Sequence, residues 1–243
     1  MKDSARSDSK GMIVLTLAYL VCGILWGYCL PQSTDAQPAD AITYRPPKRG
    51  APGGREGAGT RGLGEPLPTL TVLAPQYHTG LTAQEQPVLY WYLSQETRYQ
   101  VEIIITDRQS VKPLPAIRLN PPLQPGMQRV RLADYNLRLA PGVLYKWSVS
   151  LVLNPAQRSR DVMTAGTIER SEPSNELRGQ LVQANKMTSA GLYAKDGFWY
   201  DTIAALSELI DAEPQNTTLR QQRATLLAQE GLTEAAAYDR QRK

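Results

Sequence analysis

The sequence predicts a mainly β protein of the α+β class, in which an antiparallel β-sandwich is followed by a short α-helical tail. Two observations predict this order. Between residues 69 and 171, short apolar or alternating runs are separated by turn residues, as is typical of sandwiches. From residue 172 to residue 243, apolar residues instead recur at helical spacing. Residues 1–36 and 37–68 precede these regions as a predicted signal peptide and a linker.

The N-terminus has the order of a secretory signal peptide, with three basic residues, an apolar run from Met12 to Leu30, and then small and polar residues. We expect cleavage after Ala36, with cleavage after Ala41 as the second choice. The apolar run is close to the ~20 residues that a helix needs to span a bilayer. An uncleaved membrane anchor is therefore the alternative, and in both cases the body is expected in the periplasm or outside the cell.

Few residues in the exported body suit catalysis or metal binding. Cys22 and Cys29 both lie inside the apolar run, so the body has no thiol for a disulfide, a nucleophile or a metal site. The single histidine, His78, leaves little material for metal or general-base chemistry. The sequence therefore predicts no catalytic residues and no metal site.

The stretch from Gly57 to Gly62 reads GAGTRG, which fits the G-x-G-x-x-G spacing of dinucleotide-binding loops. Such a loop needs a buried strand before it and a helix after it, because the helix N-terminus holds the phosphates. Here proline and glycine dominate the preceding residues, and Glu65-Pro66-Leu67-Pro68 follows. The sequence therefore predicts no cofactor, and it predicts an extended linker over residues 37–68.

The linker is basic, which suggests either of two roles. Its cations could rest on an anionic membrane surface or on an acidic partner, or they could keep a solvated spacer soluble. The candidate residues are Arg45, Lys48, Arg49, Arg55 and Arg61.

Seven short strands are expected in the sandwich, without intervening helices. Their predicted ranges are Thr69 to Ala74, Val88 to Leu93, Tyr99 to Thr106, Ala116 to Leu119, Gln128 to Leu132, Leu144 to Leu153 and Met163 to Glu169.

The most specific pattern of the sandwich lies in residues 139–149, LAPGVLYKWSV. Tyr145, Trp147 and Val149 alternate with polar residues, so one face of the strand is expected to be apolar and the other polar and exposed to solvent. The order of leucine, Pro-Gly corner and tyrosine resembles fibronectin type III and immunoglobulin-like domains. That resemblance implies that the Tyr145 hydroxyl bonds back to the corner, and that Trp91 is the core tryptophan. A sugar-stacking role for these aromatics is the alternative.

The tail contains two similar segments that are 34 residues apart. Their alignment matches Ala190 with Ala224 and Gly197 with Gly231. This period, with a glycine turn, resembles the tetratricopeptide repeat. The second unit is incomplete, and about three such repeats are usually needed to stand alone. We therefore expect the tail to dock on the sandwich or on another surface.

The tail is also where we expect a protein partner to bind, in a hydrophobic groove on the helical faces. Three consecutive aromatic residues cannot share one helix face, so two are expected to pack inward and one to mark a contact surface. The candidate groove residues are Phe198, Trp199, Tyr200, Leu226, Leu227 and Leu232.

Taken together, these motifs resemble a family of uncharacterised secreted proteins abundant in cyanobacteria, catalogued as domain of unknown function 928. The resemblance covers most of residues 46 to 235. The segments that carry it are Arg49-Gly50-Ala51-Pro52, Gly57 to Gly62, LTVLAP, Gly80-Leu81-Thr82, PVLYWYL, YKWSVSLVL, Arg158-Ser159, DGFWYDTIAALSEL and LLAQEGL.

The resemblance implies an architecture and no activity. Members of the family often have one cysteine after the glycine-rich motif and another at the end of the strand equivalent to Leu144–Leu153. This chain has neither, so that disulfide is absent. Because the family keeps residues like GAGTRG, the resemblance also implies that part of the linker packs on the sandwich.

We expect an exported, non-catalytic envelope protein that acts as an interaction or adaptor module. A carbohydrate or cell-wall binding module is the alternative, and a hydrolase built around His78 is a third possibility. Acidic residues flank the aromatic run at Asp196 and Asp201, with Glu208 and Asp211 further along, but such spacing is common on solvated helices. Nucleic acid is not an expected partner, because the basic charge lies in the linker and not among stacked aromatics.

Overall fold

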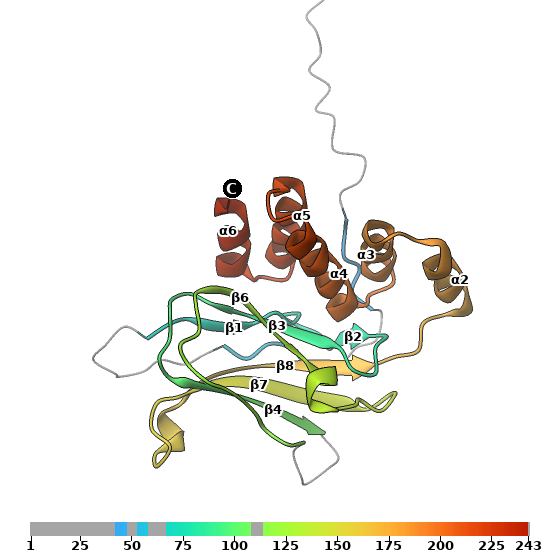
Figure 1. The fold of residues 1–243 in the computed structure, drawn as a ribbon. Helices are drawn as coiled ribbons and strands as arrows, with labels where there is room; N and C mark the ends of the chain where they lie inside the picture. The colour runs from blue at the N-terminus through green and yellow to red at the C-terminus, as the bar shows by residue number, and fades with distance from the viewer. Residues whose placement is uncertain (1–41, 48–52, 58–66, 108–113, 243) are drawn as a thin grey trace, which may run out of the picture. The chain divides into compact units, whose positions relative to one another are not determined.

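Two β-sheets and five α-helices make up the fold over the residues that the computed structural model describes, which are 42–47, 53–57, 67–107 and 114–242 (Figure 1). All of them belong to one unit that begins at Ala41. The predicted signal peptide lies outside the described residues. Within those ranges, no helix combines the length and the apolar character that crossing a bilayer requires.

The strands form a three-stranded sheet in the order β1-β3-β6 and a five-stranded sheet in the order β2-β8-β7-β4-β5. The strands are β1 (Leu70–Val72), β2 (Gly80–Thr82), β3 (Val88–Leu93), β4 (Gln100–Asp107), β5 (Ile117–Leu119), β6 (Gly126–Arg131), β7 (Leu144–Val152) and β8 (Val162–Arg170). Neighbouring strands are antiparallel except β2 and β8, which run parallel with Gly80 opposite Ile168. The prediction of a wholly antiparallel sandwich is therefore wrong at this edge, because β2 joins a strand that comes much later in the chain.

All seven predicted strands are present, with ends that differ from the predicted ones by at most a few residues. The strand from Val88 to Leu93 has the predicted bounds. Sequence reasoning missed β2, because its three residues, Gly-Leu-Thr, are all buried and show no alternation.

The alternation of β7 places Tyr145, Trp147, Val149 and Leu151 in the buried core. The backbone N–H of Ala140 donates a hydrogen bond to the Tyr145 hydroxyl over 3.1 Å, which is the corner contact that the sequence predicts. Burying a large aromatic side chain such as Trp147 stabilises the fold by roughly 2–3 kcal/mol. These aromatics therefore have a structural role.

Three of the five helices begin with a polar cap whose side chain accepts a backbone N–H. These caps are Ser174, Asn185 and Asn216. The helices are α2 (Asn175–Gln183), α3 (Lys186–Lys195), α4 (Trp199–Ala212), α5 (Thr217–Gln229) and α6 (Thr233–Gln241). Gly197 and Gly231, which the shift of 34 residues aligns, both adopt positive φ in the turns before α4 and α6.

Helices α3 to α6 pack on the sheets and share the main hydrophobic core with them, whereas Leu177 of α2 belongs to a second cluster with Leu81 and Phe198 (Figure 1). Trp199 of α4 donates its indole N–H to the Leu73 carbonyl over 2.9 Å. The Tyr200 hydroxyl accepts the indole N–H of Trp147 over 2.8 Å and donates to the Thr167 carbonyl over 2.9 Å. The tail therefore docks on the sandwich.

The described parts of the linker, residues 42–47 and 53–57, also pack against the body. Tyr44 is 1% exposed and its ring meets Trp199 edge-on at 5.0 Å between centroids. Its backbone N–H donates to the Gln229 side chain, which donates back to the Tyr44 carbonyl. For these residues the prediction of a solvated spacer is wrong, because one aromatic ring and a few backbone hydrogen bonds suffice to fix a segment that has no regular apolar pattern.

Residues 53–57 form a second attachment. The Arg55 guanidinium donates to the carbonyls of Ala74, Glu230 and Gly231, and so ties the β1–β2 connection to the turn before α6. Glu56 pairs with Ala165 of β8 through two backbone hydrogen bonds. Of the GAGTRG stretch, Gly57 is described and residues 58–62 lie outside the described ranges.

Candidate functional site

The six predicted groove residues are all buried inside the molecule, at 0–5% exposure. Phe198 caps α4 and packs with Leu81 and Leu177, while Trp199 and Tyr200 face the sheets. Leu226, Leu227 and Leu232 belong to the main core. The prediction of a groove on these residues, with one aromatic left at a contact surface, is therefore corrected. Phe198 is the N-cap of α4 and does not have helical backbone angles. The helical spacing that would turn three consecutive rings in different directions therefore does not apply to its side chain.

The predicted basic arm is divided among different surroundings. Arg45 is exposed, and its backbone N–H donates to the Ala194 carbonyl. Arg55 is half-buried and bonded to three carbonyls, so it has a structural role. Lys48, Arg49 and Arg61 lie outside the described residues.

The candidate groups for catalysis do not gather at one place. Glu208 pairs with Lys186, Asp211 pairs with Arg129, and Asp201 is buried at the start of α4. The His78 ring nitrogen Nε2 shares a hydrogen bond of 2.9 Å with the Tyr44 hydroxyl, and burial lowers the pKa of His78. Over the described ranges, no group of three or more His, Cys, Asp or Glu side chains is arranged to hold a metal ion.

Asp201 gives a prediction that can be tested by its effect on stability. Burial raises the pKa of Asp201 to about 6, although its carboxylate accepts the Ala83 N–H and side-chain hydrogen bonds from Thr82 and Gln84. The folded state therefore holds the proton of the Asp201 carboxyl group more tightly than the unfolded chain does. The stability that this proton contributes is fully present below about pH 4 and is lost as the pH rises through about 6. A shift of about two units corresponds to about 3 kcal/mol.

We therefore expect Asp201→Asn to stabilise the protein at pH 7 by about 1–3 kcal/mol and to change little at pH 4. Urea denaturation of both proteins from pH 4 to pH 7.5 measures the difference. Glu208→Gln, at an exposed carboxylate on the same helix, serves as the control. Parallel stability curves for wild type and Asp201→Asn would contradict the prediction.

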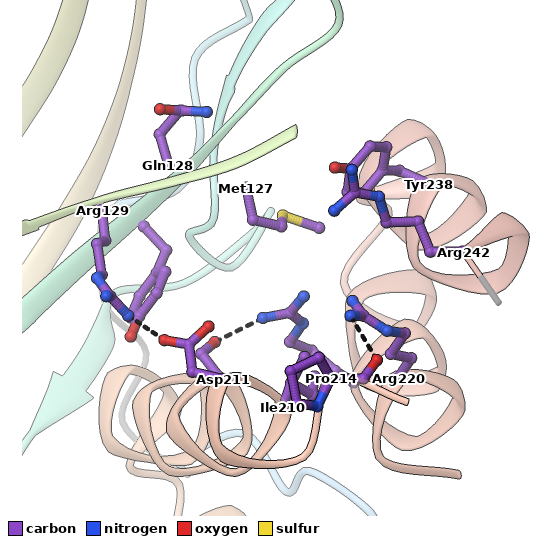
Figure 2. Close-up of a pocket in the computed structure, with 12 residues that line it drawn as sticks. Met127, Gln128, Arg129, Ile210, Asp211, Pro214, Arg220, Tyr238 and Arg242 are labelled. Carbon is purple, nitrogen blue, oxygen red and sulfur yellow. Dashed lines mark hydrogen bonds and ion pairs between the residues drawn. The ribbon is translucent and has the colours of Figure 1, made fainter. Parts of the chain in front are cut away.

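A cleft of about 490 Å³ lies between β6 and the helices α4, α5 and α6 (Figure 2). We call it the arginine cleft, because Arg129 of β6, Arg220 and Arg223 of α5, and Arg242 after α6 all line it. Its size falls within the range of ligand pockets. The carboxylate that lines it is that of Asp211.

The floor of the cleft is a buried polar network. Arg223 donates from Nε and one terminal nitrogen to the two oxygens of Asp239, both over 2.7 Å, and from its other terminal nitrogen to the Ser207 hydroxyl over 2.8 Å. Both charged side chains are at most 5% exposed. Burial raises the pKa of Tyr90, which also lines the cleft, although the nearby Arg129 charge and a hydrogen bond with Ser207 lower it. The floor is therefore rigid and already satisfied.

Two arginines at the rim of the cleft are not paired with a described carboxylate. Arg129 is paired with Asp211, whereas neither Arg220 nor Arg242 forms an ion pair with any described carboxylate. Arg220 donates from a terminal nitrogen to the Pro214 carbonyl over 3.0 Å, and its buried Nε has no partner among the described residues. The Arg242 guanidinium lies 5.2 Å from the centre of the Tyr238 ring. With Asp211 and Asp239 set against the four arginines, the cleft has a surplus of two positive charges.

Sequence reasoning missed this site. It placed the basic surplus of the chain in the linker, and in the tail it considered apolar and acidic residues but no arginines. Of those acidic residues, Asp211 lines the cleft. Arg220 and Arg223 are one helical turn apart and end up on the same side of α5, and this spacing was the available signal. The contribution of Met127 and Arg129 from β6 depends on how the tail docks, which the sequence pattern does not show.

The comparisons with known proteins identify a family and little more. The model of the family described as Domain of Unknown Function (DUF928) matches residues 56–239. None of the curated proteins matches the chain. Among solved structures, the chain is similar to one titled "Crystal structure of the C-terminal domain of wzt", with 14% identity and a TM-score of 0.28 over 56% of this chain and 87% of that one. A likeness at that TM-score carries no argument about function.

Proposed function

Because the chain belongs to the DUF928 family, whose description assigns no activity, we propose a function from its cleft: an exported, non-catalytic interaction module of the cell envelope that holds a protein partner. The observation that carries this proposal is the surplus of positive charge on the rim of the arginine cleft. Four catalytic-type side chains are engaged in ion pairs or hydrogen bonds, namely His78, Asp201, Glu208 and Asp211. The cleft is sized for a segment of a partner and not for a whole folded surface.

We also interpret the sheets as an immunoglobulin-like or fibronectin type III-like sandwich and the helices as tetratricopeptide-like. The hydrogen bond to the Tyr145 hydroxyl supports the first interpretation. The matching turns at Gly197 and Gly231 support the second. On this interpretation the sandwich itself covers the helical faces that further repeats would cover.

The proposed function is tested by photo-crosslinking in intact cells. A photoreactive phenylalanine placed at Met127, whose side chain points into the cleft (Figure 2), is expected to give one reproducible adduct whose partner peptide is identified by mass spectrometry. The same residue at Tyr77, an exposed position that does not line the cleft, should not give that adduct.

The adduct should be lost when Arg220→Glu is combined with the probe and kept with Arg240→Glu. Arg240 is exposed on α6, does not line the cleft, and undergoes the same change of charge. No adduct at Met127, or an adduct that survives Arg220→Glu, would overturn the proposal.

A further inference from the structure

The free edge of β6 borders the arginine cleft. In the described part of the chain, β6 pairs with β3 alone. Met127, Gln128 and Arg129 all line the cleft, although consecutive side chains of a strand point to opposite faces. The cleft therefore reaches the strand backbone, where every second residue turns its N–H and C=O away from β3. Such an edge can accept an additional strand.

The opposite wall supplies charge. Figure 2 shows Arg220 and Arg242 on the helix side of the cleft, across from Met127 of β6. Neither arginine has a described carboxylate partner, and the buried Arg220 Nε has no acceptor among the described residues. An unpaired buried donor is costly, so an incoming carboxylate would gain a charge-assisted hydrogen bond there.

Part of the remaining lining is apolar, and this part favours a peptide over a sugar. Met127, Ile210 and Pro214 offer adaptable apolar contacts of the kind that suit side chains. Stacking of a sugar ring would instead need an open aromatic face. The Tyr238 ring is already engaged by Tyr92, at 5.5 Å between centroids, and by Arg242.

We propose that the arginine cleft binds an extended, acidic segment of a partner protein, which adds a strand to the edge of β6 and places carboxylates on Arg220 and Arg242. This inference rests on the proposed function and specifies the chemistry of its partner. The β6 edge supplies affinity through backbone hydrogen bonds, and the two guanidinium groups select for acidic side chains.

The test is fluorescence anisotropy with the purified protein and a labelled octapeptide that alternates glutamate with valine. We expect saturable binding that weakens as salt is raised. The matching glutamine peptide should bind at least about tenfold more weakly, and so should the glutamate peptide to the Arg220→Gln/Arg242→Gln variant. Arg240→Gln should bind like wild type. Thermal melts of the three proteins confirm that each is folded.

Two further probes separate the peptide from other ligands. Methylating the backbone nitrogens of the odd or of the even peptide positions should weaken binding in only one of the two patterns, because an added strand turns alternate N–H groups toward β6. Trigalacturonate, an acidic sugar, should not displace the peptide.

Equal binding of the glutamate and glutamine peptides, or equal effects of the two methylation patterns, overturns the inference. Binding of trigalacturonate in place of the peptide overturns it in favour of an acidic sugar. If these peptides fail while the crosslink at Met127 is still lost in Arg220→Glu, the inference fails and the proposed function stands.

Discussion

Asp239→Ala is expected to lower the free energy of unfolding by about 3–5 kcal/mol. Asp239 is 1% exposed, and its carboxylate accepts hydrogen bonds from Nε and from one terminal nitrogen of Arg223, both over 2.7 Å. Its removal leaves the Arg223 guanidinium buried with the Ser207 hydroxyl as its remaining hydrogen-bond partner. An uncompensated buried charge costs far more than an exposed one. Urea denaturation followed by far-UV circular dichroism measures the loss.

Two variants control this prediction. Asp211→Ala removes an arginine partner of the same type at the exposed rim, and it should cost less than about 1 kcal/mol. Arg223→Met combined with Asp239→Leu removes both charges together, and it should recover most of the stability that Asp239→Ala loses. If Asp239→Ala and Asp211→Ala cost the same, the floor of the cleft is not the rigid network described above.

Trp199→Ala is expected to cost about 3–5 kcal/mol and to destabilise sheets and helices together. The side chain is fully buried on α4, donates to the Leu73 carbonyl, and packs edge-on against Tyr44. Its loss leaves a cavity between three parts of the chain. We therefore expect one cooperative transition at a lower urea concentration, with coincident curves from circular dichroism and from the fluorescence of the remaining tryptophans.

Trp199→Phe is the matched variant. It keeps most of the apolar volume and loses the hydrogen bond to Leu73, so its cost should be clearly smaller than that of Trp199→Ala. Two separate transitions in Trp199→Ala, with the β-sheet signal unchanged in the first, would show that the helices form a unit of their own.

The parts of the fold that follow local periodicity could be predicted from the sequence. The alternation of Tyr145, Trp147 and Val149 predicts β7 and its buried face, and the glycines at 197 and 231 predict the turns of the tail. β2 could not be predicted in this way, because it is short, buried on all sides, and paired with a strand that is distant in the sequence.

The candidate site shows the same division between local and long-range information. The apolar tail residues were expected to need a cover, either the sandwich or another surface. The sheets and Tyr44 bury them, so the groove that was expected to hold a separate partner is already filled. The arginine cleft combines β6 with three helices, so its composition follows from tertiary packing. In the sequence alone, without the docked tail, nothing distinguishes Arg220 and Arg242 from ordinary solvated residues.

The attachment of residues 42–47 and 53–57 has a practical consequence for anyone who shortens this protein. A fragment trimmed to the family match would start at Glu56, and one trimmed to the first strand would start at Leu70. Both would discard Tyr44, with its edge-on contact to Trp199, and the hydrogen bonds that Arg55 donates to three backbone carbonyls. A recombinant fragment that keeps the native contacts of Ile42 and Tyr44 with the core must therefore include Ile42.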